Sequence, residues 1–261
     1  MLILIPIFVI GLCIGSFLNV VICRLPEKES IVKSRSNCPH CKENLKAQDL
    51  IPLLSFLILK GKCRQCKKKI SWQYPLVEFA TAALFVFLAW HYNLAGNLAN
   101  PFFYRDLIFV VGLVVIFTTD LRFYLILDAV SLPLAVFAFI INFFLLSNST
   151  NYLEIAINLI IAGIIGAGFF WIQYYFSKGK WVGGGDIRLG MAMGFILGWP
   201  NVLVALLMAY IGGAIISLIL LATKVKKMKS QVPFGVFLTA ATFIVLIWGN
   251  QILDWYLSLL L

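Results

Sequence analysis

Eight runs of apolar residues follow one another along this chain, and most are long enough to cross a lipid bilayer. They lie at residues 2–22, 76–95, 105–119, 126–147, 153–176, 188–199, 201–223 and 232–257. A spanning helix needs about 20 such residues, and lipid offers the backbone no partner outside a helix or a closed barrel. The pattern therefore predicts an all-α polytopic membrane protein with about eight transmembrane helices. The third and sixth runs are the shortest.

The composition agrees with this class of protein. Of the 261 residues, 62% are hydrophobic and only 12% are charged, whereas soluble domains carry about 25% charged residues. The first run, residues 2–22, has no basic segment before it and no small-residue cleavage site after it, so it differs from a secretory signal peptide. We expect it to be a retained span.

The basic residues are unevenly distributed. Twelve of the 21 Lys and Arg residues lie between Arg24 and Lys69, and four more lie within 224–229. Because these blocks flank apolar runs, the positive-inside rule explains them better than nucleic-acid binding does. With eight spans, the rule places residues 24–75, 120–125, 177–187 and 224–231 in the cytoplasm. Both termini and Arg105 then lie on the opposite side.

Three segments follow from this pattern: a first transmembrane helix at 1–23, a cytoplasmic module at 24–75 and a transmembrane domain at 76–261. A module of about 50 residues is marginal for a hydrophobic core. Such a small fold usually depends on a bound metal or a cross-link.

Four cysteines in the module suggest which of these it uses. They form two CxxC pairs, Cys38/Cys41 and Cys63/Cys66. Two such knuckles typically supply four thiolates to a structural zinc ion, which predicts a zinc-ribbon-like module. A redox dithiol and a site without ligand are the alternatives, although the loop is too short for a thioredoxin-like fold and the cytoplasm disfavours structural disulfides. We expect His40, inside the first knuckle, to be a bystander.

Two aspartates stand at the edges of apolar runs. Asp120 ends one run, in Phe-Thr-Thr-Asp, and Asp186 opens another, after three glycines. A carboxylate at the edge of hydrocarbon is unfavourable and suggests a functional site. The charge pattern places both on the cytoplasmic side, which predicts a paired-carboxylate hydrolase with Asp120 and Asp186 as catalytic residues. In such a pair one carboxylate activates water as general base, and the protonated one polarises the scissile carbonyl.

Each acid near these runs also has a structural interpretation. Asp128 precedes an apolar run, so capping of a helix N-terminus is its ordinary use, and support of the active site is the alternative. Asp186 could cap a helix too. Gly183 and Gly185 argue for more than a cap, because glycine permits positive φ and lets another backbone, such as that of a peptide substrate, approach closely.

With these residues in view, the chain resembles the bacterial type IV prepilin peptidases, which are GxGD-type intramembrane aspartic proteases. The resemblance runs nearly end to end, and Asp120 and Asp186 stand at the family's catalytic positions. One departure is visible, since the family has Pro where Leu127 precedes Asp128. The segments that carry the resemblance are Gly15–Pro26, Ile51–Ser55, Lys60–Arg64, Tyr74–Glu78, Gly183–Leu189 and Val232–Gly235.

The resemblance implies a function. The protein would lie in the bacterial inner membrane, remove the basic leader of prepilins or pseudopilins after a glycine on the cytoplasmic side, and N-methylate the new N-terminus. Methylation implies S-adenosylmethionine as cofactor, and Glu78 is a candidate for its site. A peptidase without methyltransferase activity and a non-enzymatic scaffold with a zinc docking module remain alternatives. Nothing in the sequence defines the oligomeric state, and no nucleic-acid partner is expected.

Overall fold

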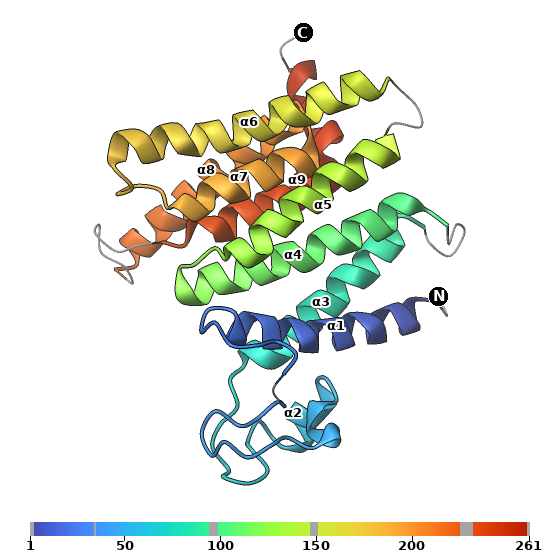
Figure 1. The fold of residues 1–261 in the computed structure, drawn as a ribbon, viewed down its shortest axis with the longest axis vertical. Helices are drawn as coiled ribbons and strands as arrows, with labels where there is room; N and C mark the ends of the chain where they lie inside the picture. The colour runs from blue at the N-terminus through green and yellow to red at the C-terminus, as the bar shows by residue number, and fades with distance from the viewer. Residues whose placement is uncertain (1–2, 34, 94–98, 147–150, 225–231, 260–261) are drawn as a thin grey trace. The chain divides into compact units, whose positions relative to one another are not determined.

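The computed structural model describes residues 3–33, 35–93, 99–146, 151–224 and 232–259. These residues are predominantly α-helical, as predicted (Figure 1). The predicted basic loop 224–231 lies outside the described residues except for its first residue. The elements are α1 Leu4–Arg24, η1 Ala47–Leu50, α2 Leu54–Ile58, α3 Gln73–His91, α4 Pro101–Phe123, α5 Asp128–Leu146, α6 Tyr152–Ser177, α7 Gly184–Leu197, α8 Asn201–Ala222 and α9 Phe234–Ser258.

Seven of the described helices are long and apolar enough to cross a membrane: α1, α3, α4, α5, α6, α8 and α9. The third predicted run, which seemed short in the sequence, extends to the 23 residues of α4. The sixth predicted run becomes α7, which has only 14 residues and is therefore about 21 Å long. The chain is a multi-pass helical membrane protein in which α7 is shorter than a typical span.

The chain divides into two compact units, residues 1–115 and 116–261. In the first unit, α1 packs against α3 through glycines. A Cβ atom on Gly11 would lie 2.6 Å from the Cα of Ala82, and one on Gly15 would lie 2.7 Å from the Cα of Glu78. Small residues at such contacts let two helix backbones approach closely, which favours helix association in lipid.

A buried acid in the same unit is fully paired. Asp106, in the first turns of α4, has no exposed surface. It accepts a hydrogen bond of 2.5 Å from the hydroxyl of Tyr92 and forms an ion pair of 2.7 Å with Arg105. Because a buried charge is tolerated only when it is paired and hydrogen-bonded, this cluster fastens the end of α3 to the start of α4.

In the second unit, α7 packs against α5, α6 and α9, and Figure 1 shows it beside α6. The contact with α6 is made backbone to backbone. A Cβ atom on Gly190 would lie 2.4 Å from the carbonyl oxygen of Gly166, and one on Gly194 would lie 2.2 Å from that of Ala162. No larger side chain fits at these positions, so the two helices are held at close range.

Two asparagines explain how α7 can end early. The last carbonyls of a helix need partners, and hydrocarbon supplies none. The side-chain amide of Asn142, on α5, donates to the carbonyls of Phe195 and Ile196 at 2.7 and 3.0 Å. Asn158, on α6, exchanges two hydrogen bonds with the backbone of Trp199. Neighbouring helices thus replace the missing continuation of α7.

Candidate active site and metal site

Asp120 lies in the last turn of α4 and is 5% exposed. Its Oδ2 atom accepts a hydrogen bond of 3.1 Å from the backbone N–H of Val236, the third residue of α9. A Cβ atom on Gly235 would lie only 2.8 Å from that oxygen. The carboxylate of Asp120 therefore occupies the N-terminus of α9, where unpaired N–H groups and the helix dipole favour negative charge.

Asp186 occupies a similar position on its own helix. It is the third residue of α7 and is 9% exposed. Its Oδ2 atom accepts a hydrogen bond of 2.9 Å from the N–H of Gly183, and its own N–H donates to the carbonyl of Gly183 at 3.1 Å. The residue thus caps α7 while its carboxylate stays at the helix N-terminus.

Ile126, in the segment between α4 and α5, lies against both helix starts. Its Cβ atom is 2.8 Å from the position of a Cβ on Gly185, and its Cδ1 atom is 3.0 Å from that of a Cβ on Gly235. Gly185 directly precedes Asp186, and the Cβ position of Gly235 is 2.8 Å from Oδ2 of Asp120, so Ile126 contacts the backbone next to both acids. The structure thus brings together the two acids that the sequence singled out, 66 positions apart.

The three glycines before Asp186 serve different purposes. Gly183 is extended, with φ of −81°, so the expectation of positive φ is not met at this position. Gly184 has open space around it, with nothing within 4 Å of an added Cβ. Gly185 does permit a close approach, as predicted, but the approaching group is Ile126 of the same chain.

Asp128 is the first residue of α5. Its Oδ1 atom forms an ion pair with Arg188, two residues after Asp186. Both side chains are about half exposed. Asp128 therefore ties the start of α5 to the first turns of α7, next to the two acids.

Sequence reasoning missed the contribution of Gly235 and Val236. Gly235 ends the segment Val232–Gly235, which belongs to the resemblance without an assigned role, and Val236 follows directly after it. The available signal is Pro233, which occupies the N-cap position of α9, because proline next to a helix start marks a terminus with free N–H groups. What the sequence does not reveal is that the acceptor for those groups is Asp120.

The four predicted metal ligands also come together. The Sγ atoms of Cys38, Cys41, Cys63 and Cys66 all lie within 4.8 Å of one another, and the group does not include His40. The Cys38 and Cys66 sulfurs, from different knuckles, are 3.9 Å apart. A tetrahedral zinc ion with bonds of about 2.3 Å separates its sulfur ligands by about 3.8 Å. The donor set therefore fits a metal ion.

The two knuckles have the same backbone structure, shifted by 25 positions. The amide of each first cysteine, Cys38 or Cys63, donates to the carbonyl of the residue five positions later. The carbonyl of the same cysteine accepts from a lysine four positions later, Lys42 or Lys67, and both lysines have φ of 58°. Each knuckle thus holds its cysteine pair in the same geometry.

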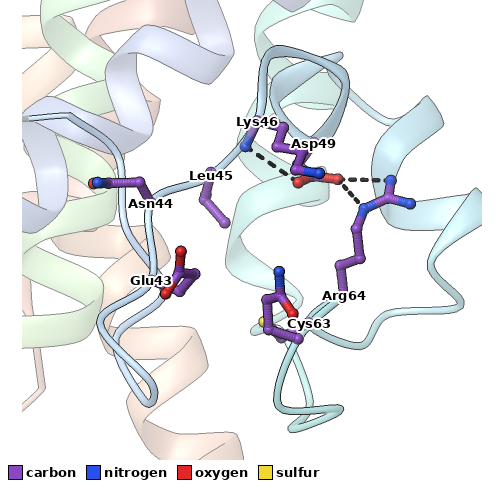
Figure 2. Close-up of a pocket in the computed structure, with 8 residues that line it drawn as sticks. Glu43, Asn44, Leu45, Lys46, Asp49, Cys63 and Arg64 are labelled. Carbon is purple, nitrogen blue, oxygen red and sulfur yellow. Dashed lines mark hydrogen bonds and ion pairs between the residues drawn. The ribbon is translucent and has the colours of Figure 1, made fainter.

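An ion pair joins the second knuckle to the preceding turn. Asp49, in η1, accepts hydrogen bonds from Arg64 at 2.7 and 2.9 Å and from the backbone N–H of Lys46 at 3.2 Å, as Figure 2 shows. The hydrogen bonds from Arg64 hold the pKa of Asp49 below its ordinary value. These contacts fix the loop between the two knuckles.

Glu78, the candidate for the methyl-transfer site, is nearly buried in the second turn of α3. Its Oε2 atom accepts a hydrogen bond of 2.8 Å from the backbone N–H of Leu53. Leu53 has φ of 57° and ψ of −49°, a backbone conformation that is rare for a non-glycine residue. Glu78 therefore anchors a strained turn of the module to a candidate span.

Two family models match the chain. The model of the bacterial peptidase A24 N-terminal domain matches residues 9–92, and the model of the type IV leader peptidase family matches residues 107–218. The first covers the two helices that flank the cysteine module. The second covers both aspartates.

Several similar proteins carry the name prepilin leader peptidase/N-methyltransferase. The one from Legionella pneumophila is 34% identical, over 95% of this chain and 92% of the relative. The one from Bacillus subtilis is 31% identical over 97% and 98%, and that from Aeromonas salmonicida is 33% identical over 98% and 94%. No solved structure matches the chain.

Proposed function

Because the chain belongs to the type IV leader peptidase family, we propose that Asp120 and Asp186 are the catalytic pair with which it cleaves prepilins. Relatives over nearly the whole chain carry the name prepilin leader peptidase/N-methyltransferase, which supports both activities for this protein. The observation that supports the assignment is the placement of both carboxylates at helix N-termini, on either side of Ile126.

The geometry suits the two complementary roles of an aspartic peptidase. Both acids are nearly buried, so they act in an environment of low dielectric constant, where electrostatic interactions are strong. Two adjacent carboxylates do not readily carry charge together, so the pair shares a proton. The ionised member takes a proton from water, and the protonated member donates to the scissile carbonyl oxygen.

Gly184 offers a place for the substrate backbone. It lies two residues before Asp186, is exposed, and leaves space that a side chain would fill. An extended peptide could lie over this glycine with its scissile carbonyl near the carboxylates. The Asp128–Arg188 pair supports this arrangement by holding the start of α5 against α7.

The orientation follows from the charge pattern. Residues 24–69 contain twelve basic and four acidic side chains, and by the positive-inside rule the module faces the cytoplasm. The active site then opens on the same side, where it would cut the basic leader of a prepilin or pseudopilin after a glycine.

Methylation of the new N-terminus requires a methyl donor, for which S-adenosylmethionine is the proposed cofactor. We place the methyl-transfer site at the module and its flanking helices, with Glu78 as a candidate residue. The four cysteines would hold a structural zinc ion, which stabilises a module that has little hydrophobic core. This role leaves the chemistry of both reactions to other residues.

Cleavage of a prepilin by Asp120→Asn and Asp186→Asn variants, in purified and reconstituted protein, tests the assignment. Loss of cleavage in both variants supports it, whereas retained cleavage in both would overturn the assignment of these two residues. A wild-type protein that does not cleave prepilin would favour the scaffold alternative. Mass spectrometry of the cleaved pilin then separates the two remaining possibilities. A product without the added methyl group would identify a peptidase that lacks methyltransferase activity.

A further inference from the structure

The cysteine module exposes several large apolar side chains. Leu54, Leu57 and Ile58 lie on α2 at the spacing that places residues on one face of a helix, and Ile58 is 73% exposed. Leu50 and Ile51, just before α2, are exposed as well. These five residues are called the docking face below. An exposed apolar patch can mark an interaction site, and three of these side chains share one face of α2.

Two contacts place α2 beside the first turns of the candidate span α3. The N–H of Leu53, the residue before α2, binds Glu78, the sixth residue of the candidate span α3. The start of α2 therefore lies level with the second turn of α3, about 8 Å along that helix from its first residue.

The second contact involves an aromatic residue next to the span. Trp72 directly precedes α3 and is 68% exposed. Its ring lies 5.0 Å from that of Phe56, on α2. Because tryptophan favours the boundary between lipid headgroups and acyl chains, this pair fastens α2 to a residue suited to that boundary.

The charge next to the docking face agrees with a lipid partner. Lys60, Lys62 and Lys67–Lys69 follow α2 in the chain and are all exposed. Apolar side chains beside a cluster of lysines are typical of segments that lie in the surface of an anionic bilayer. A docking site for a soluble partner protein would not need to lie beside the first turns of a membrane-spanning helix.

We propose that the docking face lies in the headgroup region of the bilayer and binds anionic phospholipid, so that the cysteine module rests on the membrane instead of projecting into water. The lysines after α2 contact the lipid phosphates, and Trp72 marks the same level on α3. This inference is independent of the catalytic assignment.

The test uses the full-length chain in nanodiscs that contain phosphatidylglycerol. A photo-crosslinking benzoylphenylalanine replaces Ile58 in one variant and Glu43, an exposed acidic residue of the first knuckle, in a matched control. Both sites are exposed, so neither change disturbs a packed core, and the metal content of each variant confirms an intact module.

After irradiation, mass spectrometry identifies what each position has bound. We expect phospholipid adducts at position 58, several-fold more abundant than at position 43. We also expect them to fall when phosphatidylcholine replaces phosphatidylglycerol. Crosslinks from position 58 to a second copy or to another part of this chain, or equal lipid labelling at both positions, would overturn the proposal. Labelling that is unchanged in phosphatidylcholine would overturn the role of the lysines.

Discussion

The Oδ2 atom of Asp120 accepts a hydrogen bond of 3.1 Å from the backbone N–H of Val236, 116 residues further along the chain. The interaction joins the last turn of α4 to the first turn of α9. A residue proposed for catalysis therefore also accepts a hydrogen bond from a free backbone N–H group at the N-terminus of α9. The position of the acid is therefore tied to the position of α9.

The first prediction concerns the aspartates themselves. Asp120→Asn and Asp186→Asn should each lower the rate of leader cleavage by about 10²–10⁴-fold, the usual contribution of an acid or base. Asparagine keeps an oxygen that accepts the N–H of Val236 or Gly183, so the fold should persist. Denaturing gel electrophoresis, which separates the prepilin from the shorter cleaved pilin, measures the loss. Asp254→Asn, an exposed change on α9, should leave the rate unchanged.

Gly235 provides a test of the geometry without changing an acid. In Gly235→Ala the new methyl group would lie 2.8 Å from Oδ2 of Asp120, which forces the carboxylate to move. We expect a large loss of cleavage with the helical circular dichroism spectrum intact. Gly168→Ala is the matched control, because nothing lies within 4 Å of its Cβ position. Full activity of Gly235→Ala would contradict the described contact.

The ion pair between Asp128 and Arg188 should make a small contribution. Because both side chains are about half exposed, we expect a coupling of about 0.5 kcal/mol, or about twofold in cleavage rate. Asp128→Asn and Arg188→Gln should have similar effects, and the double variant should be no worse than either. A double-mutant cycle on kcat/KM measures the coupling. A loss of several orders of magnitude in Asp128→Asn alone would mean that this residue takes part in the chemistry.

Metal binding can be tested in the purified protein. Elemental analysis should find about one zinc ion per chain, and Cys63→Ser should remove it, since zinc affinity depends on all four thiolates. Hydrogen exchange of the module amides should then accelerate, because metal binding and folding are linked in small metal domains. Cys13→Ser, in α1, should retain the metal. Zinc retained after loss of Cys63 would exclude the four-cysteine site.

The Asp49–Arg64 pair predicts a dependence on pH. The pKa of Asp49 is lowered in the folded protein, so the pair stabilises the module above the unfolded value of about 4. That contribution is lost as the pH falls through the folded pKa. Because Arg64 is 39% exposed, we expect Asp49→Asn to destabilise the module by only about 1 kcal/mol at pH 7.

Hydrogen exchange of residues 46–66 measures this difference between the two proteins at each pH. The metal content is measured at each pH, and only pH values at which both proteins retain the metal are compared. The difference should shrink below about pH 4, and Glu43→Gln should show none at any pH. A difference that persists unchanged in acid would show that the pair is not the source of the stability.

The helical class could be predicted because each span carries its own signal, a run of apolar residues. The shortness of α7 could be suspected from residues 188–199, but not explained. Its end depends on Asn142 and Asn158, which lie on two other helices and reach the backbone around residue 196 through space. Such tertiary hydrogen bonds leave no local pattern in the segment that they terminate.

The same distinction applies to the site. The four cysteines could be assigned to one metal site from the sequence, because the CxxC spacing of each knuckle is a local pattern. The three glycines indicated that another group approaches the backbone closely. The group that approaches Gly185 is Ile126, 59 positions earlier in the chain, and the glycines do not identify it. The hydrogen-bond partner of Asp120 could not be predicted either. It is the backbone N–H group of Val236, and any residue type at that position would offer the same group.

The seam between α6 and α7 limits how the active site can move. With Gly190 and Gly194 in direct contact with the backbone of α6, sliding or rotation of one helix would drive its neighbouring side chains into the other, and packed interiors deform little. The two helices therefore form one rigid unit, and Asp186 lies on it. A displacement of Asp186 therefore requires α6 and α7 to move together, because neither helix can shift along the other.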